Sequence, residues 1–264
     1  MARDLDKHDL YELCVQSPEH LVPMLRAMHG GEARVLGEDF AGAAALSYLW
    51  ADSSPGARAI AVDLDEGALL RRPAHARVER IVGDVRAATR PGKHDCDILF
   101  VGNFSIGYLR TRAELLGYLR HALARLRPAG AFICDTYGGE SAFLTGDVAR
   151  DHSLPDGRRV RYTWEQREAN PLTGIVTDVL HFQVDRGGEV ELRLPDAFVY
   201  HWRLWSVPEL RDAMADAGFA STEVYDRTPD ATDDEGRAYM IPATGDGDAD
   251  DSFIVCVAAR ASRS

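Results

Sequence analysis

The sequence predicts an α/β protein: a mostly parallel sheet of seven strands with helices on both faces, plus an inserted antiparallel β-layer. Between residues 33 and 136, short apolar runs alternate with helical patterns, which is typical of a parallel sheet with crossover helices. Residues 158–204 change to long alternating runs joined by the turn signals Asn170-Pro171 and Gly187-Gly188. Such runs indicate antiparallel strands.

Seven apolar runs account for the predicted sheet, and helical patterns separate several of them. The strands are expected at Ala33–Leu36, Ala57–Val62, Val78–Val82, Asp97–Val101, Ala131–Cys134, Ala220–Tyr225 and Phe253–Ala259. Helices are expected at Ala43–Trp50, Glu66–Arg71, Thr111–Leu126 and from Ser206 to Gly218. The last two begin with a Ser or Thr followed three residues later by Glu, which is the capping-box pattern. The sheet domain is therefore expected to comprise residues 1–136 and 205–264, with 137–204 as the insertion.

Composition narrows the classes of function. The 264 residues carry a net charge of −12, 45% are hydrophobic and 27% are charged, as in an ordinary globular chain. No run approaches the roughly 20 apolar residues of a membrane helix, and the first 20 residues are too charged for a signal peptide. Four widely spaced cysteines, without a C-x-x-C pair, indicate no zinc site or disulfide framework. We expect a cytoplasmic protein with no membrane or nucleic-acid partner and no metal.

More than half of the negative charge lies in one segment. Residues 229–251 contain eight acids and one Arg, a net charge of −7. A charge run of this kind is typical of a solvated surface loop. The alternative is a lid that adds negative potential near a cationic acceptor.

Carboxylates follow three consecutive predicted strands: Glu38 and Asp39 the first, Asp63 the second and Asp84 the third. Ligands of open parallel sheets bind beyond the carboxyl ends of the strands. One such acid is often only a helix N-cap, but three together favour a ligand with hydroxyl and amino donors. Neither G-x-G-x-x-G nor a Walker loop follows the first strand, so the sequence has no phosphate-binding loop for a pyrophosphate at this position. The pattern favours a positively charged nucleoside without phosphate.

In this order of elements the chain resembles class I S-adenosylmethionine-dependent methyltransferases over nearly all of residues 11–259. The best local match is NFSIGYLRTRAELLGYLRHALARLRPAGAFICD at 103–135, and HWRLWSVPELRDAMADAGF at 201–219 is similar to the same group. These stretches are frequent in enzymes that methylate small molecules at N or O. The resemblance implies a Rossmann-like domain that binds S-adenosylmethionine, with residues 137–204 as a substrate cap.

The resemblance also implies a role for each cofactor-binding residue. Asp63 is expected to bind the ribose hydroxyls, and Asp84, with the backbone of Val85, the adenine amine. The loop after the first strand is expected to pass beneath the methionine part, while the turn after the fourth strand faces the sulfonium and its methyl group. The full implied set is Tyr11, Glu38, Phe40, Ala41, Gly42, Asp63, Leu64, Asp84, Val85, Asn103 and Phe104.

The glycine loop departs from the family pattern. The usual acid-x-G-x-G-x-G is here E-D-F-A-G-A-A, in which Gly42 is retained and Ala44 stands at the final glycine position. The form acid-x-F-x-G-x-G occurs in DNA amino-methyltransferases, which also carry an Asn/Asp-Pro-Pro-aromatic motif for a flipped base. Residues 102–105 read GNFS, without prolines. A small-molecule acceptor is therefore expected.

The acceptor side carries weaker signals. His201, next to the aromatic cluster of Tyr200, Trp202 and Trp205, is a candidate general base. Tyr137 and Asp135, after the fifth strand, are the other candidates. A half-buried histidine bonded to a neighbour is the alternative for His201. The predicted acceptor contacts are Tyr108, Tyr137, Tyr162, Trp164, His201 and Trp202, although aromatic residues on strands are also typical of a core.

We therefore expect methyl transfer by in-line displacement from S-adenosylmethionine to an N or O atom of a small molecule. Two other classes stay open: a non-catalytic S-adenosylmethionine-binding protein with a degenerate site, and a nicotinamide-dependent oxidoreductase, for which the glycine turn is missing. Metal-assisted O-methylation through Asp135 and Asn103 lacks a tight carboxylate cluster. The acceptor and the oligomeric state, a homodimer included, stay open.

Overall fold

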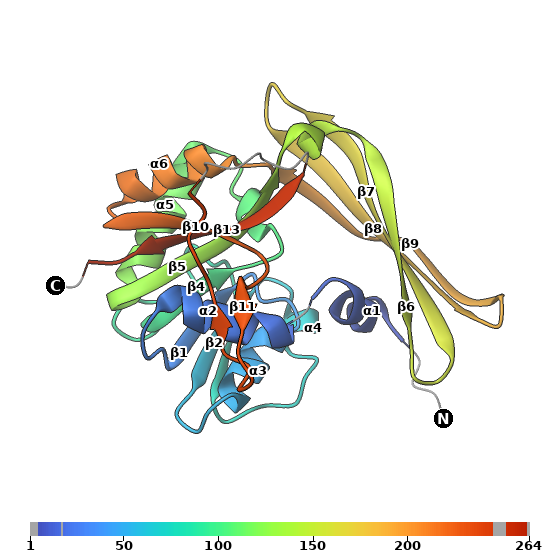
Figure 1. Ribbon diagram of the computed structural model, residues 1–264, viewed down its shortest axis with the longest axis horizontal. Coiled ribbons are helices and arrows are strands. Elements are labelled where there is room, and N and C mark those ends of the chain that lie inside the picture. Colours follow the sequence, from blue (N-terminus) through green and yellow to red (C-terminus); the bar gives the residue numbers. More distant parts are fainter. Residues whose placement is uncertain (1–4, 17, 245–251, 263–264) are drawn as a thin grey trace. The chain divides into compact units, whose positions relative to one another are not determined.

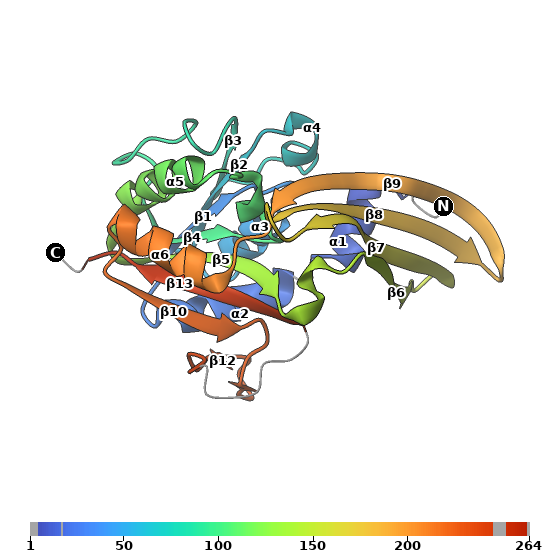
Figure 2. The same cartoon turned by 90° about the horizontal axis from the view of Figure 1, so that it is seen from above.

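The computed structural model describes residues 5–16, 18–244 and 252–262 (Figures 1 and 2). These residues form two compact units. Unit 1 comprises residues 5–16 and 140–204, and unit 2 comprises residues 18–139 and 205–262. Unit 2 contains the mostly parallel sheet and unit 1 an antiparallel sheet, which confirms the predicted fold class. The N-terminal helix belongs to unit 1 rather than to the sheet domain that the sequence predicts for residues 1–136.

The sheet of unit 2 has seven strands in the order β10-β13-β5-β4-β1-β2-β3. Strand β13 pairs antiparallel with both neighbours, and the other pairs are parallel. The strand order reverses between β1 and β4, which is where ligands of open α/β sheets bind. The strands are β1 (Val35–Asp39), β2 (Arg58–Asp63), β3 (Val78–Val82), β4 (Cys96–Val101), β5 (Leu126–Gly138), β10 (Ser221–Asp226) and β13 (Phe253–Arg260).

Helices cover both faces of this sheet, as predicted (Figure 2). Met28 and Trp50 belong to a core cluster on the face of α2 and α3, while Tyr118 and Met214 belong to a second cluster beneath α5 and α6. The helical segments of unit 2 are α2 (Pro18–His29), α3 (Ala45–Asp52), α4 (Glu66–Leu69), the 3-10 helix η1 (Ser105–Tyr108), α5 (Arg112–Ala124) and α6 (Val207–Ala217). No helix among the described residues is long and apolar enough to span a membrane.

Both predicted capping boxes are present. Thr111 and Glu114 bond reciprocally at the start of α5, and Ser206 and Glu209 do the same at α6. Each box satisfies two backbone N–H groups that have no partner within the helix, that of the N-cap residue and that of the third helical residue. Helix α6 ends at Gly218, whose φ of +105° requires the freedom of a glycine.

Strands β1 and β5 of unit 2 end several residues later than the sequence predicts. Strand β1 runs to Asp39 because it pairs with β2 as far as the Asp39–Val62 register position. Strand β5 runs to Gly138 because β13 pairs with it from Ala131 onwards. Glu38, Asp135 and Tyr137 are therefore strand residues, and not residues of the loops that follow.

Unit 1 is a four-stranded antiparallel sheet, ordered β6-β7-β8-β9, with α1 packed against it. Its elements are α1 (Lys7–Cys14), the 3-10 helix η2 (Glu140–Phe143), β6 (Gly146–Ser153), β7 (Arg158–Asn170), β8 (Ile175–Arg186) and β9 (Glu189–Arg203). Leu10 of α1 is fully buried in a cluster with Val160 and Phe182. Strand β6 is not predicted, because its residues are almost all exposed and show no apolar alternation.

The acidic segment is partly folded. A hairpin of β11 (Ala231–Thr232) and β12 (Ala238–Tyr239) lies within it, closed by an ion pair between Asp233 and Arg237 at 2.8 Å. Met240 packs against the core cluster of α2. The hairpin is mostly exposed, as expected for a solvated segment, but it forms two short strands where the sequence predicts a loop; residues 245–251 lie outside the described residues.

Candidate cofactor site and acceptor region

The loop after β1 has left-handed backbone at three alternate positions. Phe40, Gly42 and Ala44 have φ values of +58°, +52° and +55°, and they stand where the family pattern has its three glycines. The left-handed region costs a residue with a Cβ atom roughly 1–2 kcal/mol. A Cβ atom added at Gly42 would meet no atom within 4 Å, so the backbone is open on that side. The loop thus has three φ values that glycine adopts freely, although Phe40 and Ala44 carry Cβ atoms.

Glu38 holds this loop against the start of α3. Its carboxylate accepts the Ser47 backbone N–H at 2.9 Å and the Ser47 hydroxyl at 2.5 Å. Ala44, the N-cap of α3, has no side-chain acceptor, so Glu38 caps the helix from β1. Burial raises the pKa of Glu38 to about 7, partly offset by the two Ser47 donors. In the structure, Glu38 is therefore a buried residue that supports the start of α3.

Asp63 joins the loop after β1 to the turn after β2. Its Oδ2 accepts the Gly42 N–H at 2.7 Å, and its Oδ1 accepts the Asp65 N–H at 2.8 Å. A carboxylate has about four acceptor sites, so these two bonds leave capacity on both oxygens for a diol. The next side chain, Leu64, is 71% exposed and offers an apolar surface for a flat ring.

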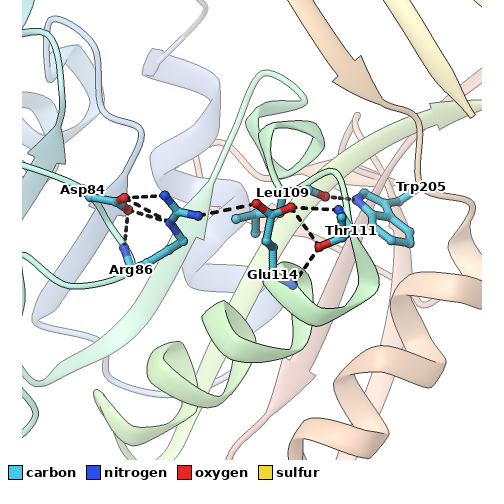
Figure 3. Close-up of polar contacts among 6 residues, drawn as sticks. All are labelled: Asp84, Arg86, Leu109, Thr111, Glu114 and Trp205. Carbon is cyan, nitrogen blue, oxygen red and sulfur yellow. Dashed lines mark hydrogen bonds and ion pairs between the residues drawn. The ribbon is translucent and has the colours of Figure 1, made fainter.

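Asp84 is already paired with Arg86 (Figure 3). Arg86 Nη2 lies 2.6 Å from Asp84 Oδ2, and Arg86 Nε and N also donate to this carboxylate. Arg86 Nη1 lies 3.6 Å from Glu114, whose other oxygen closes the capping box with Thr111. The Arg86 side chain lowers the pKa of Asp84. An adenine amine would therefore have to share this carboxylate with Arg86.

Other implied residues are buried or offer ring surface. Ala41 and Val85 are buried, at 1% and 4% exposure, and the Ala41 N–H donates to the Val62 carbonyl at 3.0 Å. Phe40 stacks on the half-exposed Tyr108, with ring centroids 5.7 Å apart. The predicted cofactor residue Phe40 and the predicted acceptor residue Tyr108 are thus direct neighbours.

The turn after β4 is held by Asp135. Asn103 and Phe104 have φ values of +53° and +61°, and their N–H groups donate to the two oxygens of Asp135 at 3.0 and 2.7 Å. The ring of Phe104 meets Tyr137 edge to face at 4.9 Å. Burial raises the pKa of Asp135, and the nearby Arg227 and the backbone donors partly offset this.

The acceptor residues predicted between 140 and 204, together with Tyr11, belong to unit 1. Tyr11 contacts Phe198 with centroids 5.0 Å apart, and Tyr162 is 8% exposed in the core of the unit. Trp164 packs against the same core. Trp202, 6% exposed, stacks on Tyr200 at 4.4 Å.

His201 lies apart from the aromatic cluster to which the sequence assigns it. Side chains alternate along a strand, so His201 faces the side of β9 opposite to Tyr200 and Trp202. Its Nδ1 lies 3.1 Å from the Thr177 hydroxyl, as the alternative of a bonded neighbour expects, but His201 is exposed and not half-buried. Trp205 belongs to unit 2, where its Nε1 donates to the Leu109 carbonyl at 2.9 Å (Figure 3).

Three arginines near the predicted site were not singled out from the sequence. Arg86 follows an acid-x-Arg spacing that recurs at Glu32, Asp156 and Glu165, each ion-paired with the Arg two residues on. That spacing is a signal that could have found Arg86. Arg72 donates to the Ala43 carbonyl of the loop after β1 at 3.2 Å, and Arg125 is buried beside Asp39. No local pattern marks either.

The fold is that of solved methyltransferases. DesVI from Streptomyces venezuelae is similar with a TM-score of 0.70 at 19% identity, over 98% of this chain and 100% of that chain. CalS10, an amino pentose methyltransferase from Micromonospora echinaspora involved in calicheamicin biosynthesis, is similar with a TM-score of 0.65 at 18% identity, over 98% and 100%. The sugar N-methyltransferase KedS8 from Streptoalloteichus sp. ATCC 53650 has a TM-score of 0.62 at 16% identity, over 100% and 95%.

No family model matches the sequence, and no curated protein matches it. The resemblance to class I methyltransferases is therefore confirmed at the level of the fold, including the inserted antiparallel sheet.

Proposed function

We propose that the chain is an S-adenosylmethionine-dependent methyltransferase acting on an amino nitrogen of a small molecule. The observation that carries the proposal is the hydrogen bond between Gly42 and Asp63. It joins the acid at the end of β2 to an open backbone position of the loop after β1, beside the point where the strand order reverses. A methyltransferase fold with this junction suits a nucleoside that carries a ribose diol and no phosphate.

The residues present fit this cofactor, which supplies an activated methyl carbon for in-line displacement. Asp63 accepts from a diol while keeping its two backbone bonds, and Leu64 covers an apolar ring face. Asp84 and Arg86 have side chains 35% and 49% exposed. A pair at such exposure is worth only about 0–1 kcal/mol, so an adenine amine can compete for Asp84 at little cost.

The choice of nitrogen is supported by the solved neighbours. CalS10 is an amino pentose methyltransferase, KedS8 is a sugar N-methyltransferase and MtfA is a glycopeptide N-methyltransferase. We infer an amino sugar as the acceptor class. The amine of this acceptor must be neutral to attack. Of the candidate bases, Tyr137 is favoured because its ring contacts Phe104. His201 and the aromatic residues of unit 1 stay proposed acceptor contacts of a cap formed by residues 137–204.

The experiment is a methyl-transfer assay with isotope-labelled S-adenosylmethionine and a panel of amino sugars. Each amine is paired with its N-acetyl analogue, which keeps the hydroxyls and removes the nucleophile. We expect one labelled methyl group on the amines and none on the analogues. Label on the analogues would assign the transfer to oxygen. Cofactor binding without product from any acceptor would support the non-catalytic alternative.

A further inference from the structure

The turn after β4 is unusual in its backbone. Asn103 and Phe104 are consecutive residues in the left-handed region, at φ +53° and +61°. Asn tolerates that region through its short polar side chain, whereas for a bulky aromatic residue it is a steric outlier. Phe104 is also the N-cap of η1 and has no side-chain cap bond there. A contact from outside the turn must therefore stabilise its conformation.

Asp135 supplies that contact. It lies in β5, is 2% exposed, and receives the Asn103 N–H on Oδ2 and the Phe104 N–H on Oδ1. Each oxygen has its own backbone donor, so the carboxylate matches the two converging N–H groups of the turn. Hydrogen bonds of this type, with an ionised acceptor, are about twice as strong as neutral ones.

The surroundings of the turn come from β5 and β10. Tyr137, two residues after Asp135 on the same face of β5, meets the Phe104 ring edge to face. Arg227, just after β10, lies over the Phe104 ring at 5.9 Å and attracts the Asp135 carboxylate. Backbone and ring of Phe104 are thus both fixed by neighbouring elements of unit 2.

We propose that Asp135 is a positioning residue for methyl transfer, because it holds the turn of Asn103 and Phe104, the residues expected to face the cofactor sulfonium. This inference rests on the proposed function. Asp135 touches neither reactant; it acts through the two N–H groups it accepts. Asn cannot replace it, because an amide offers one oxygen and turns an NH₂ group towards the second N–H donor.

The structure offers a matched control at the other end of the strands. Asp97, at the start of β4, also accepts two consecutive backbone N–H groups, those of Arg34 and Val35, both at 2.8 Å. Both groups share Asp97 Oδ2, and Arg127 pairs with Oδ1, so Asp97→Asn removes a carboxylate charge and its ion pair at the edge of the sheet remote from the turn after β4. Loss of stability alone affects both variants, whereas loss of the turn affects only Asp135→Asn.

The first measurement is the affinity of the full chain for S-adenosylhomocysteine by calorimetry. We expect Asp135→Asn to bind roughly tenfold more weakly, as for one lost hydrogen bond to a charged group, and Asp97→Asn to bind like the wild type. Hydrogen exchange at residues 103–109 is the second readout, and it should become faster only in Asp135→Asn. Wild-type affinity and exchange in Asp135→Asn would overturn the inference and leave the proposed function standing. A wild type that binds no ligand would overturn both.

A glycine background keeps the test decisive if Asp135→Asn alone does not fold. Gly tolerates the left-handed region, so Phe104→Gly removes the strain that Asp135 is inferred to counter. The Asp135→Asn change should then cost less than threefold in affinity when made on Phe104→Gly. A loss of tenfold or more on the Phe104→Gly background would show that the carboxylate does not act through the turn.

Discussion

Arg125 donates from Nη1 to both carboxylate oxygens of Asp39, at 2.8 and 3.1 Å, and neither side chain is exposed. The Tyr118 hydroxyl donates to the same carboxylate at 2.8 Å. Asp39 is the last residue of β1, so this network anchors the strand end from which the cofactor loop departs. The start of the loop is thus held in the core by the Asp39 carboxylate, whose charge Arg125, the C-cap of α5, neutralises.

Removing Arg125 should be far more costly than removing a similar arginine nearby. Arg125→Met leaves Asp39 as a buried charge without its cation, and we expect the free energy of unfolding to fall by about 3–5 kcal/mol. Arg127→Met is the control, because the pair of Arg127 with Asp97 is 39% and 16% exposed. Its loss should cost no more than about 1 kcal/mol. Urea unfolding measures both, and equal losses would contradict the anchoring role.

Glu38 makes stability depend on pH. Its pKa is about 7 in the folded chain, above the ordinary value of 4.5, so the folded state binds the proton more tightly. The free energy of unfolding should therefore fall as pH rises from 4.5 to about 7, by up to about 3 kcal/mol from this group. Glu38→Gln should remove that part of the dependence, measured as the difference between the two unfolding curves. Glu66→Gln on the exposed side of α4 controls for the lost charge, and an unchanged slope in Glu38→Gln would contradict the assignment.

Ala44→Gly tests the strain of the cofactor loop. The change relieves a left-handed alanine, a gain of about 1–2 kcal/mol. It also loses a buried methyl group, about 0.8 kcal/mol, and adds glycine entropy, about 0.5–1 kcal/mol. We expect a net change near zero in thermal or urea unfolding. Ala51→Gly, in α3 with a helical backbone and a fully buried methyl group, has only the losses and should cost about 1.5 kcal/mol. Equal costs would mean that φ at Ala44 is not strained.

Local sequence rules were enough for much of the fold. Helix ends were predicted correctly at Thr111, Ser206 and Gly218. At each of these ends the backbone is stabilised by residues only a few positions apart, so the sequence pattern is local. The alternation of apolar runs predicted the strands because each buried strand is itself apolar. Strand β6 was not predicted because its residues are exposed. Its pairing with β7 therefore leaves no apolar pattern in the sequence.

The partners of the acids could not be predicted in the same way. Asp63, Asp84 and Asp135 all look alike in the sequence, as carboxylates at or after strand ends. In the structure the first accepts from Gly42, the second pairs with Arg86 and the third holds the turn at Asn103 and Phe104. These differences depend on contacts between separate loops, which sequence spacing does not encode. The left-handed φ of Ala44 is a similar case, because Ala, unlike Gly or Asn, does not favour that region.

Calorimetric titration with S-adenosylmethionine, on the wild type, Asp63→Ala and Asp95→Ala, tests the central claim most directly. Asp95 is the matched control: it is half-buried and accepts a glycine N–H, that of Gly92, at 2.6 Å, but it stands before β4. We expect one site in the wild type and in Asp95→Ala, and at least roughly tenfold weaker binding in Asp63→Ala, as for lost hydrogen bonds to a charged acceptor. No binding by the folded wild type, or equal binding by all three proteins, would contradict the account.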